Sequence, residues 1–256
     1  MSSILVAPAK PDKLAFFTSM KVIRYKHNLD FSYALGATLV FELLKTRPEL
    51  VNRIFIKSNV KNTPDLEQIL ALCSEHKIEV LEGDKAFNIL SPKENCFIIA
   101  EFKKFKTELD KESSNIVLVN PSDAGNIGTI IRTAIGLGFN NIAIISPAVD
   151  VFDPKAIRAS MGAIFHANVH YFDTIEEYQS AFPNHNRYAF MLRNAKKFDE
   201  TPIKAPFSLI FGNEASGLSD EYADFCQSVK ISQTSNIDSF SLPIAASIAM
   251  YENRLS

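Results

Sequence analysis

A carboxylate between two glycines, directly after an apolar run, is the feature of this 256-residue chain best suited to chemistry. Glu214 lies between Gly212 and Gly217, and residues 208–211 form the apolar run. Glycine has no Cβ, so backbone amides can approach a bound molecule, and the pattern predicts a ligand loop with Glu214 facing the ligand. The alternative is an ordinary surface turn in which Ser219 caps the next helix. The loop alone leaves both interpretations open.

A second polar segment follows the apolar run 116–119 and leads into an amphipathic pattern over residues 127–137. Asn126 stands where a helix N-cap is expected, and Arg132 follows about one and a half turns later. An unpaired guanidinium is costly to bury on an otherwise apolar helix, so Arg132 indicates an anionic partner. The alternative is a capped helix with an exposed arginine.

A third polar segment, residues 232–241, separates two apolar runs. A helix of small residues follows it, with Pro243 in the first turn. Taken by itself, the segment is a Ser/Asn-rich loop in which Ser239 or Ser241 caps that helix.

Composition indicates a globular protein without a membrane span, because no apolar run approaches about 18 residues. The first residues carry no basic stretch ahead of an apolar one, so no secretory signal is expected. Cys73, Cys96 and Cys226 are widely spaced and odd in number, which favours reduced thiols in a cytoplasmic protein over disulfides or zinc. We expect no bound metal.

The net charge of −2 does not by itself indicate a nucleic-acid partner, but the N-terminal arm is locally basic. Its charged residues are one acid, Asp12, and five bases: Lys10, Lys13, Lys21, Arg24 and Lys26. A local basic patch can bind phosphate even in a neutral protein. A solvated helix face is the alternative.

The order of apolar runs predicts two α/β units, residues 1–110 and 111–256, joined by the charged segment 102–115. In the first unit we expect strands at 53–56, 77–81 and 96–102, and a helix capped by Thr63 with Pro64 in its first turn. In the second, strands and helices alternate as in a parallel sheet covered on both faces. The expected strands are 116–119, 142–145, 169–172, 188–192, 208–211 and 228–231, and the expected helices are 127–137, 154–160, 175–182, 220–225 and 243–253.

Other nucleotide and hydrolase patterns do not fit. Gly125 and Gly128 lack the G-x-G-x-x-G spacing, no Gly-Lys-Ser/Thr follows a strand, and no G-x-S-x-G elbow occurs. The glycines therefore predict neither a dinucleotide fold, nor a P-loop, nor a serine hydrolase.

Taken in order, the segments resemble those of the SpoU or TrmH family of RNA ribose 2′-O-methyltransferases, in the SPOUT superfamily. The first family motif matches Asn126, Gly128 and Arg132-Thr133, and the second matches Gly212-Asn213-Glu214 with Gly217-Leu218. Between them, residues 158–163 with Phe165-His166 resemble the Arg-x-Ser-x-Gly-Ala element of the family. The resemblance extends over residues 113 to 254.

The third family motif is kept only in part. Ser235 stands where the family has Gly, Ser241 where it has Asn, and Pro243 where it has Ser. A serine has a shorter reach and fewer donors than an amide, so we expect cofactor binding to survive better than rate.

The resemblance implies a C-terminal trefoil knot, an exception to the rule that chains do not thread loops. It also implies S-adenosylmethionine as cofactor and a homodimer formed through the closing helix, with both chains completing each site. The implied cofactor-binding residues are Met191, Leu192, Gly212, Asn213, Gly217, Ile231, Ser239 and Phe240. The implied catalytic residues are Asn126, Arg132, Glu214, Ser239 and Ser241.

The implied reaction is in-line attack of a ribose 2′-hydroxyl on the methyl group. A guanidinium with a pKa above about 12 is a poor base, so we interpret Arg132 as a phosphate clamp that also stabilises the developing alkoxide. Glu214 would hold either Arg132 or Asn126 in place.

The first unit resembles the ribosomal-protein-like α/β/α domain of family members that act on ribosomal RNA. This predicts RNA binding through shape and phosphates, with Lys21, Arg24 and Lys26 as candidates, and favours rRNA over tRNA. Two alternatives remain: a tRNA 2′-O-methyltransferase, or a catalytically weak RNA-binding or assembly factor with a methyltransferase fold. A generic nucleotide-binding α/β domain ranks last.

Overall fold

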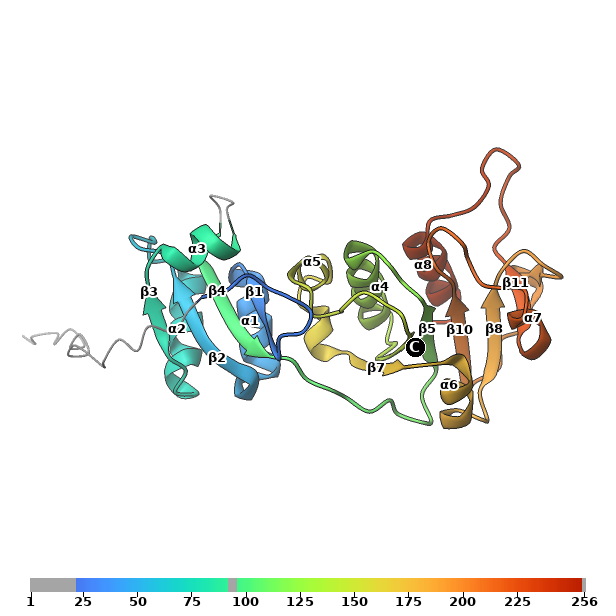
Figure 1. Ribbon diagram of the computed structural model, residues 1–256, viewed down its shortest axis with the longest axis horizontal. Helices are drawn as coiled ribbons and strands as arrows, with labels where there is room; N and C mark the ends of the chain where they lie inside the picture. The colour runs from blue at the N-terminus through green and yellow to red at the C-terminus, as the bar shows by residue number, and fades with distance from the viewer. Residues whose placement is uncertain (1–21, 92–95, 255–256) are drawn as a thin grey trace, which may run out of the picture.

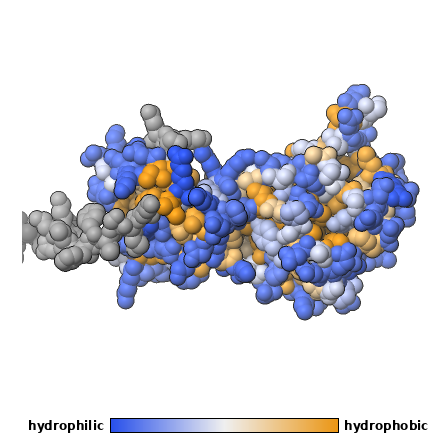
Figure 2. Space-filling model, viewed as in Figure 1, coloured by the Kyte–Doolittle hydropathy of each residue, from blue (hydrophilic) through white to orange (hydrophobic). Residues whose placement is uncertain are grey.

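The computed structural model describes residues 22–91 and 96–254. It shows two lobes joined at a narrower waist (Figures 1 and 2). The candidate RNA-binding residues Arg24 and Lys26 are exposed. Lys10, Lys13 and Lys21, predicted in the same basic arm, lie outside the described residues.

The first lobe is a four-stranded mixed sheet with the strand order β1-β4-β2-β3. Strand β4 pairs antiparallel with β1 and with β2, and β2 pairs parallel with β3. Its elements are β1 (Phe31–Leu35), α1 (Ala37–Thr46), η1 (Pro48–Leu50), β2 (Val51–Ile56), α2 (Pro64–Glu75), β3 (Val80–Glu82), α3 (Lys85–Leu90) and β4 (Ile98–Lys103).

The second lobe is a seven-stranded sheet with the order β7-β6-β5-β10-β8-β11-β9, in which all pairs are parallel. Its strands are β5 (Asn115–Val119), β6 (Asn141–Ile145), β7 (Asn168–Phe172), β8 (Asn186–Phe190), β9 (Lys196–Lys197), β10 (Phe207–Phe211) and β11 (Gln227–Lys230). Its helices are α4 (Ala124–Gly136), α5 (Pro154–Ala159), η2 (Ala163–His166), α6 (Ile175–Ala181), η3 (Phe198–Glu200), α7 (Tyr222–Phe225) and α8 (Leu242–Glu252).

The predicted α/β class and parallel sheet are confirmed. The chain forms β8 and the edge strand β9 before β10 enters between β5 and β8 in the middle of the sheet. A threaded C-terminal segment requires such a return, and the threading itself stays a prediction.

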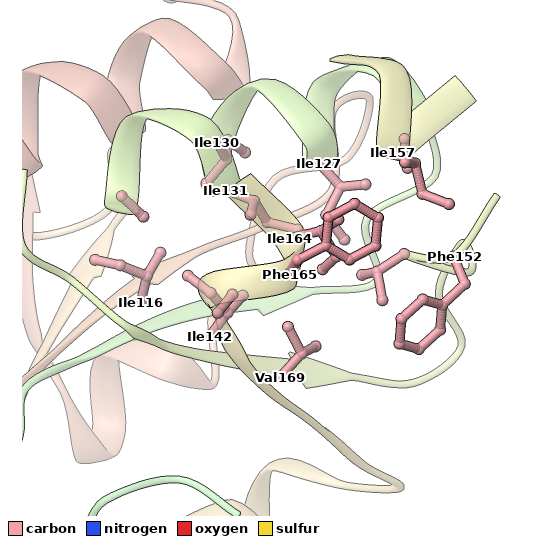
Figure 3. Packing of buried hydrophobic residues seen from close by; sticks show 14 of the residues in the cluster. Ile116, Ile127, Ile130, Ile131, Ile142, Phe152, Ile157, Ile164, Phe165 and Val169 are labelled. Atoms are coloured by element: carbon pink, nitrogen blue, oxygen red, sulfur yellow. The ribbon is translucent and has the colours of Figure 1, made fainter. Parts of the chain in front are cut away.

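The central strands are buried along their whole length because helices cover both faces of the sheet. Figure 3 shows Ile127, Ile130 and Ile131 of α4 gathering with Ile157 and Phe165 on one side of this sheet. The strands consequently read as continuous apolar runs, which made them predictable from sequence.

The structure confirms one of the predicted helix caps and contradicts two others. Thr63 caps α2 as predicted, accepting a hydrogen bond from the amide of Leu66. The prediction that Asn126 caps α4 is wrong, because Asp123 does so and its carboxylate accepts from the amide of Asn126. Ser219 is not a cap either, since α7 begins at Tyr222.

The closing helix α8 begins at Leu242, with Ser241 at the N-cap position, but the Ser241 side chain makes no capping hydrogen bond. Helix α8 has Pro243 in its first turn, as predicted. Within residues 22–91 and 96–254, no helix is both long and apolar enough to cross a membrane.

Candidate functional site

A pocket of about 480 Å³ opens at the carboxyl ends of the adjacent parallel strands β8, β10 and β11. Ligands gather at such strand ends in open α/β sheets. All eight residues predicted to bind the cofactor line this pocket: Met191, Leu192, Gly212, Asn213, Gly217, Ile231, Ser239 and Phe240. Glu214 lines it as well.

One wall of the pocket is the loop from Gly212 to Gly217, which folds back on itself through a bridge between Asn213 and Gly217. A Cβ on Gly212 would lie 2.2 Å from the carbonyl carbon of Gly217 and 2.4 Å from the amide nitrogen of Leu218. Gly217 has φ +68, which favours glycine, yet a Cβ there would meet nothing within 4 Å. Gly212 is therefore required for space, and Gly217 for backbone conformation.

The Asn213 side chain fixes the shape of this loop. Its Oδ1 accepts hydrogen bonds from the amides of Ala215, at 2.9 Å, and Ser216, at 3.3 Å. Its Nδ2 donates to the carbonyl oxygen of Asn120, at 2.8 Å, just after β5. The loop after β10 is thus tied to the loop after β5.

Glu214 makes the second tie between these two loops. Its carboxylate accepts from the amide and hydroxyl of Ser122, at 3.0 and 2.7 Å, from the amide of Asp123, at 3.2 Å, and from Nδ2 of Asn126, at 3.2 Å. Partial burial alone would raise the pKa of Glu214, but the hydrogen bonds from Ser122 and Asn126 outweigh it and lower the pKa below its ordinary value. At neutral pH Glu214 is therefore an ionised carboxylate that these hydrogen bonds keep in place.

Aromatic side chains form an apolar part of the pocket. Phe190 at the end of β8 stacks on Phe211 at the end of β10, with ring centroids 4.4 Å apart and planes at 16°. The next two residues of the chain, Met191 and Leu192, also line the pocket, and Leu192 is 72% exposed. An apolar surface with a large exposed side chain at its edge suits a partly apolar ligand.

The segment from β11 to α8 covers another side of the pocket with Ile231, Ser239 and Phe240. Figure 1 shows this segment projecting beyond the rest of the domain. Nε2 of Gln233 donates to the carbonyl oxygens of Ile237 and Asp238, which shapes the projecting part. Ser241 does not line the pocket.

Arg132 also lies outside the pocket. It is exposed on α4, where it lines a groove with Ser247, Ile248 and Tyr251 of α8. The structure agrees with the alternative of an exposed arginine, because the buried residues of α4 leave Arg132 on the outer side of the helix. Of the two partners proposed for Glu214, the structure supplies Asn126 and not Arg132.

Sequence reasoning missed two residues of the Glu214 cluster, Ser122 and Asp123. Asp123 caps α4 and forms an ion pair of 2.7 Å with Lys155, and the hydrogen bond from Lys155 lowers its pKa. The available signal was Asp three residues before Asn126, which is the spacing of a side-chain cap. At the pocket rim, Arg193 pairs with Asp220 at 3.1 Å, and no sequence signal marked that pair.

Elsewhere in the part of the chain that the structure describes, no three His, Cys, Asp or Glu side chains are grouped to hold a metal ion. Cys73 and Cys96 are buried and Cys226 is half-buried, each as a free thiol. Burial raises the pKa of Cys73 to about 11 and that of Cys226 to about 12.

A model of the SpoU rRNA Methylase family matches residues 113–251, more than half of the chain. The chain belongs to the SpoU rRNA methylase family. A model described as RNA 2′-O ribose methyltransferase substrate binding matches residues 33–87 of this SpoU methylase. It is therefore an RNA ribose 2′-O-methyltransferase with a substrate-binding domain ahead of its catalytic domain.

Relatives of this SpoU methylase include two curated enzymes. It is 26% identical over 227 residues to the 23S rRNA (guanosine(2553)-2′-O)-methyltransferase RlmP of Bacillus subtilis, with 86% of each chain covered. It is 27% identical over 150 residues to the 23S rRNA (uridine(2479)-2′-O)-methyltransferase of Streptomyces viridochromogenes. This match covers 54% of this chain and 50% of the relative.

The fold of this SpoU methylase is also found in a solved structure, an AdoMet-bound rRNA methyltransferase from Sinorhizobium meliloti. The two have a TM-score of 0.76 at 24% identity, with 89% of each chain covered. The SpoU methyltransferase AviRb from Streptomyces viridochromogenes, in complex with AdoMet, gives 0.73 at 18% identity, with 87% of this chain and 89% of that chain covered.

Proposed function

We propose that this SpoU methylase transfers the methyl group of S-adenosylmethionine to a ribose 2′-hydroxyl of 23S ribosomal RNA. The observation that carries the proposal is the pocket at the ends of β8, β10 and β11, with the glycine loop and the held Glu214 in its wall. Two curated relatives are 23S rRNA 2′-O-methyltransferases, and two solved relatives hold AdoMet.

The pocket suits this cofactor in size and lining. A volume of about 480 Å³ falls within the range of roughly 300–1,000 Å³ usual for small-molecule sites. Gly212 keeps the wall free of a side chain, and the Phe190–Phe211 stack, Met191 and Leu192 offer apolar surface. When bound, the cofactor would supply a methyl group carried on a positively charged sulfur. The rest of the cofactor would remain as a neutral thioether after the transfer.

Within this proposal, Glu214 and Asn126 organise the site. Glu214 holds the start of α4 against the pocket wall, so Asn126 keeps a fixed position beside it. Ser239, exposed in the projecting segment, would contact the cofactor or the ribose. Ser241, outside the pocket at the start of α8, would act only after the segment shifts or from a second copy of the chain.

Arg132 would complete the site from the second copy of a homodimer. Helix α8 carries apolar side chains on every face, and Ile244 and Tyr251 are 50% and 55% exposed. A helix that is apolar all round is normally buried, so this exposed face suits a second copy. Arg132 lies beside that face, and it would reach the partner's pocket as a phosphate clamp that stabilises the alkoxide as it forms.

The substrate-binding domain, residues 1–110, would anchor the ribosomal RNA, and the catalytic domain would comprise residues 111–256. The proposed boundary falls between the end of β4 at Lys103 and the start of β5 at Asn115. Arg24 and Lys26 are exposed and available to phosphates. Action on cellular ribosomal RNA implies a cytoplasmic enzyme.

A second candidate function is an RNA-binding or assembly factor with little activity. The position of Ser241 outside the pocket favours it, because the family has Asn there. Calorimetric titration with S-adenosylmethionine separates the two functions. The enzyme should release heat on binding the cofactor, and should then pass labelled methyl groups to unmodified rRNA. An assembly factor should bind RNA but give no heat with the cofactor and transfer no methyl group.

A further inference from the structure

The turn of residues 160–166, which follows α5, matches the family pattern but lies outside the cofactor pocket. Met161 and Gly162, between α5 and η2, both adopt the left-handed conformation, with φ of 52 and 87. Ser160 is buried, and its hydroxyl donates to the carbonyl oxygen of Ile157 at 2.8 Å. Because this turn lies outside the cofactor pocket, its contacts with other parts of the chain indicate what it does.

Helix α1 of the substrate-binding domain lies directly against this turn. A Cβ on Gly162 would be 2.9 Å from Cβ of Glu42. The carboxylate of Glu42 is 3.2 Å from Nε2 of His166, and Nε of Arg47 donates to the carbonyl oxygen of Phe165 at 2.8 Å. Both the middle of α1 and its C-terminal cap therefore contact the turn.

Apolar packing lies beneath these polar contacts. Phe165 meets Phe102 of β4 edge to face, with centroids 5.4 Å apart, and Phe102 also contacts Phe152 at 6.3 Å. The Arg47 guanidinium lies over the Phe105 ring, 4.3 Å from its centroid. The buried residues of the two domains consequently form one continuous cluster, unlike the small polar contact of freely moving domains.

The same turn connects to the candidate active site through helix packing. A Cβ on Gly128 would lie 2.3 Å from the carbonyl oxygen of Ala156, so the backbones of α4 and α5 touch. Helix α4 carries Asn126, which is bound to Glu214. A packed path therefore leads from α1 through the turn, α5 and α4 to the pocket wall. Figure 3 shows its middle part, where Phe165 of the turn and Ile157 of α5 lie near Ile127 of α4.

We propose that residues 160–166 form a socket that holds the substrate-binding domain at a fixed place relative to the pocket and thereby selects which ribose is methylated. The proposal rests on the proposed methyl transfer. A misplacement of about 1 Å can cost on the order of 100-fold in rate, so a fixed distance between RNA anchor and methyl donor would determine the target. Glu42, Arg47 and Phe165 are then positioning residues.

The test is the double substitution Glu42→Arg with Arg47→Ala, which removes both polar ties to the socket. The matched control is Glu49→Arg with Lys45→Ala, because these exposed residues are on the same segment, give the same charge change and make none of the contacts above. In hydrogen exchange, the amides of Ala163 and Phe165 should exchange at least tenfold faster in the first variant only. Equal exchange in both variants would show that α1 is not held by the socket.

Methylation of transcribed 23S rRNA provides the functional half of the test. In the first variant, KM for the RNA should rise at least fivefold and methyl groups should appear on more than one ribose, with unchanged affinity for S-adenosylmethionine. An unchanged KM and a single methylated ribose would overturn the socket. If the unaltered enzyme transfers no methyl group, the proposed function fails, while the exchange measurement still tests the docking. A variant with Arg47→Lys in place of Arg47→Ala keeps the charge at this position. Its Ala163 and Phe165 amides should exchange more slowly than those of the double variant.

Discussion

At the scale of single residues, Glu214 connects the loop after β10 to the loop after β5. Its carboxylate accepts four hydrogen bonds from Ser122, Asp123 and Asn126, which lower its pKa. A carboxylate with a lowered pKa is a weaker base, because general bases work best with a pKa near the working pH. In the proposed reaction, the proton of the ribose hydroxyl would therefore pass to a group other than Glu214.

Glu214→Gln should change how stability depends on pH. Because the folded pKa is below the ordinary value of 4.5, the stabilisation by Glu214 is fully present above about pH 4.5 and is lost as pH falls through the folded pKa. Glu214→Gln should therefore lower the melting temperature at pH 7 and flatten its fall below pH 4.5. Thermal melts from pH 3 to 8 measure this, and the exposed Glu221→Gln should follow the unaltered protein. Parallel curves for all three proteins would refute the linkage.

Gly212→Ala should damage the pocket wall. The new Cβ would clash with backbone atoms of Gly217, which have little room to move. We expect at least tenfold weaker binding of S-adenosylmethionine, a cost of about 1.4 kcal/mol or more. Gly136→Ala is the control, since the space around Gly136 is open and it lies outside the pocket, and its affinity should stay within about threefold. Calorimetry that gave equal affinities for both variants would contradict the proposed cofactor wall.

Sequence alone predicted the residues of the pocket better than their contacts. The glycine-flanked carboxylate and the Asn126 partner were within reach, because spacing after a strand carries that information. The place of Arg132 was not, because burial depends on which way a helix turns against the sheet. Ser122 was missed since a serine after Pro121 has no distinctive spacing.

At the scale of elements, the glycines of α4 have opposite consequences. Gly128→Ala places a methyl group 2.3 Å from the Ala156 carbonyl oxygen, so it should destabilise the protein by about 1–3 kcal/mol. Gly136→Ala, at the end of the same helix with nothing within 4 Å, should be neutral or stabilise by up to about 1 kcal/mol. Denaturant unfolding of both variants measures this, and equal effects would mean that α4 and α5 are not in close contact.

The strands of the second sheet were predicted to within a few residues because burial on both faces gives uninterrupted apolar runs. Strand β1 and helix α1 were missed. Helix α1 begins after Gly36 without a side-chain cap, so no start signal marked it. The two-residue strand β9 exists only through pairing with β11, which no local pattern reports.

At the scale of the whole molecule, the proposed homodimer predicts that Ile244→Asp yields monomers. The substitution puts a charge on the exposed apolar face of α8, where a second copy would bury it. Methyl transfer should be lost, because Arg132 no longer reaches a partner's pocket. Leu70→Asp, a matched change at an exposed position of α2, should leave mass and activity unchanged. Sedimentation equilibrium measures the mass, and a dimeric, active Ile244→Asp variant would contradict the interface.

The most direct test of the central claim is transfer of labelled methyl from S-adenosylmethionine to ribosomal RNA purified from cells that lack this protein. Digestion to nucleosides and mass spectrometry then identify the labelled product. We predict a 2′-O-methylnucleoside from 23S rRNA with the unaltered enzyme, and a loss of at least 100-fold in rate with Arg132→Ala at nearly unchanged cofactor affinity. Label on a base, or full activity of the Arg132→Ala enzyme, would contradict the account.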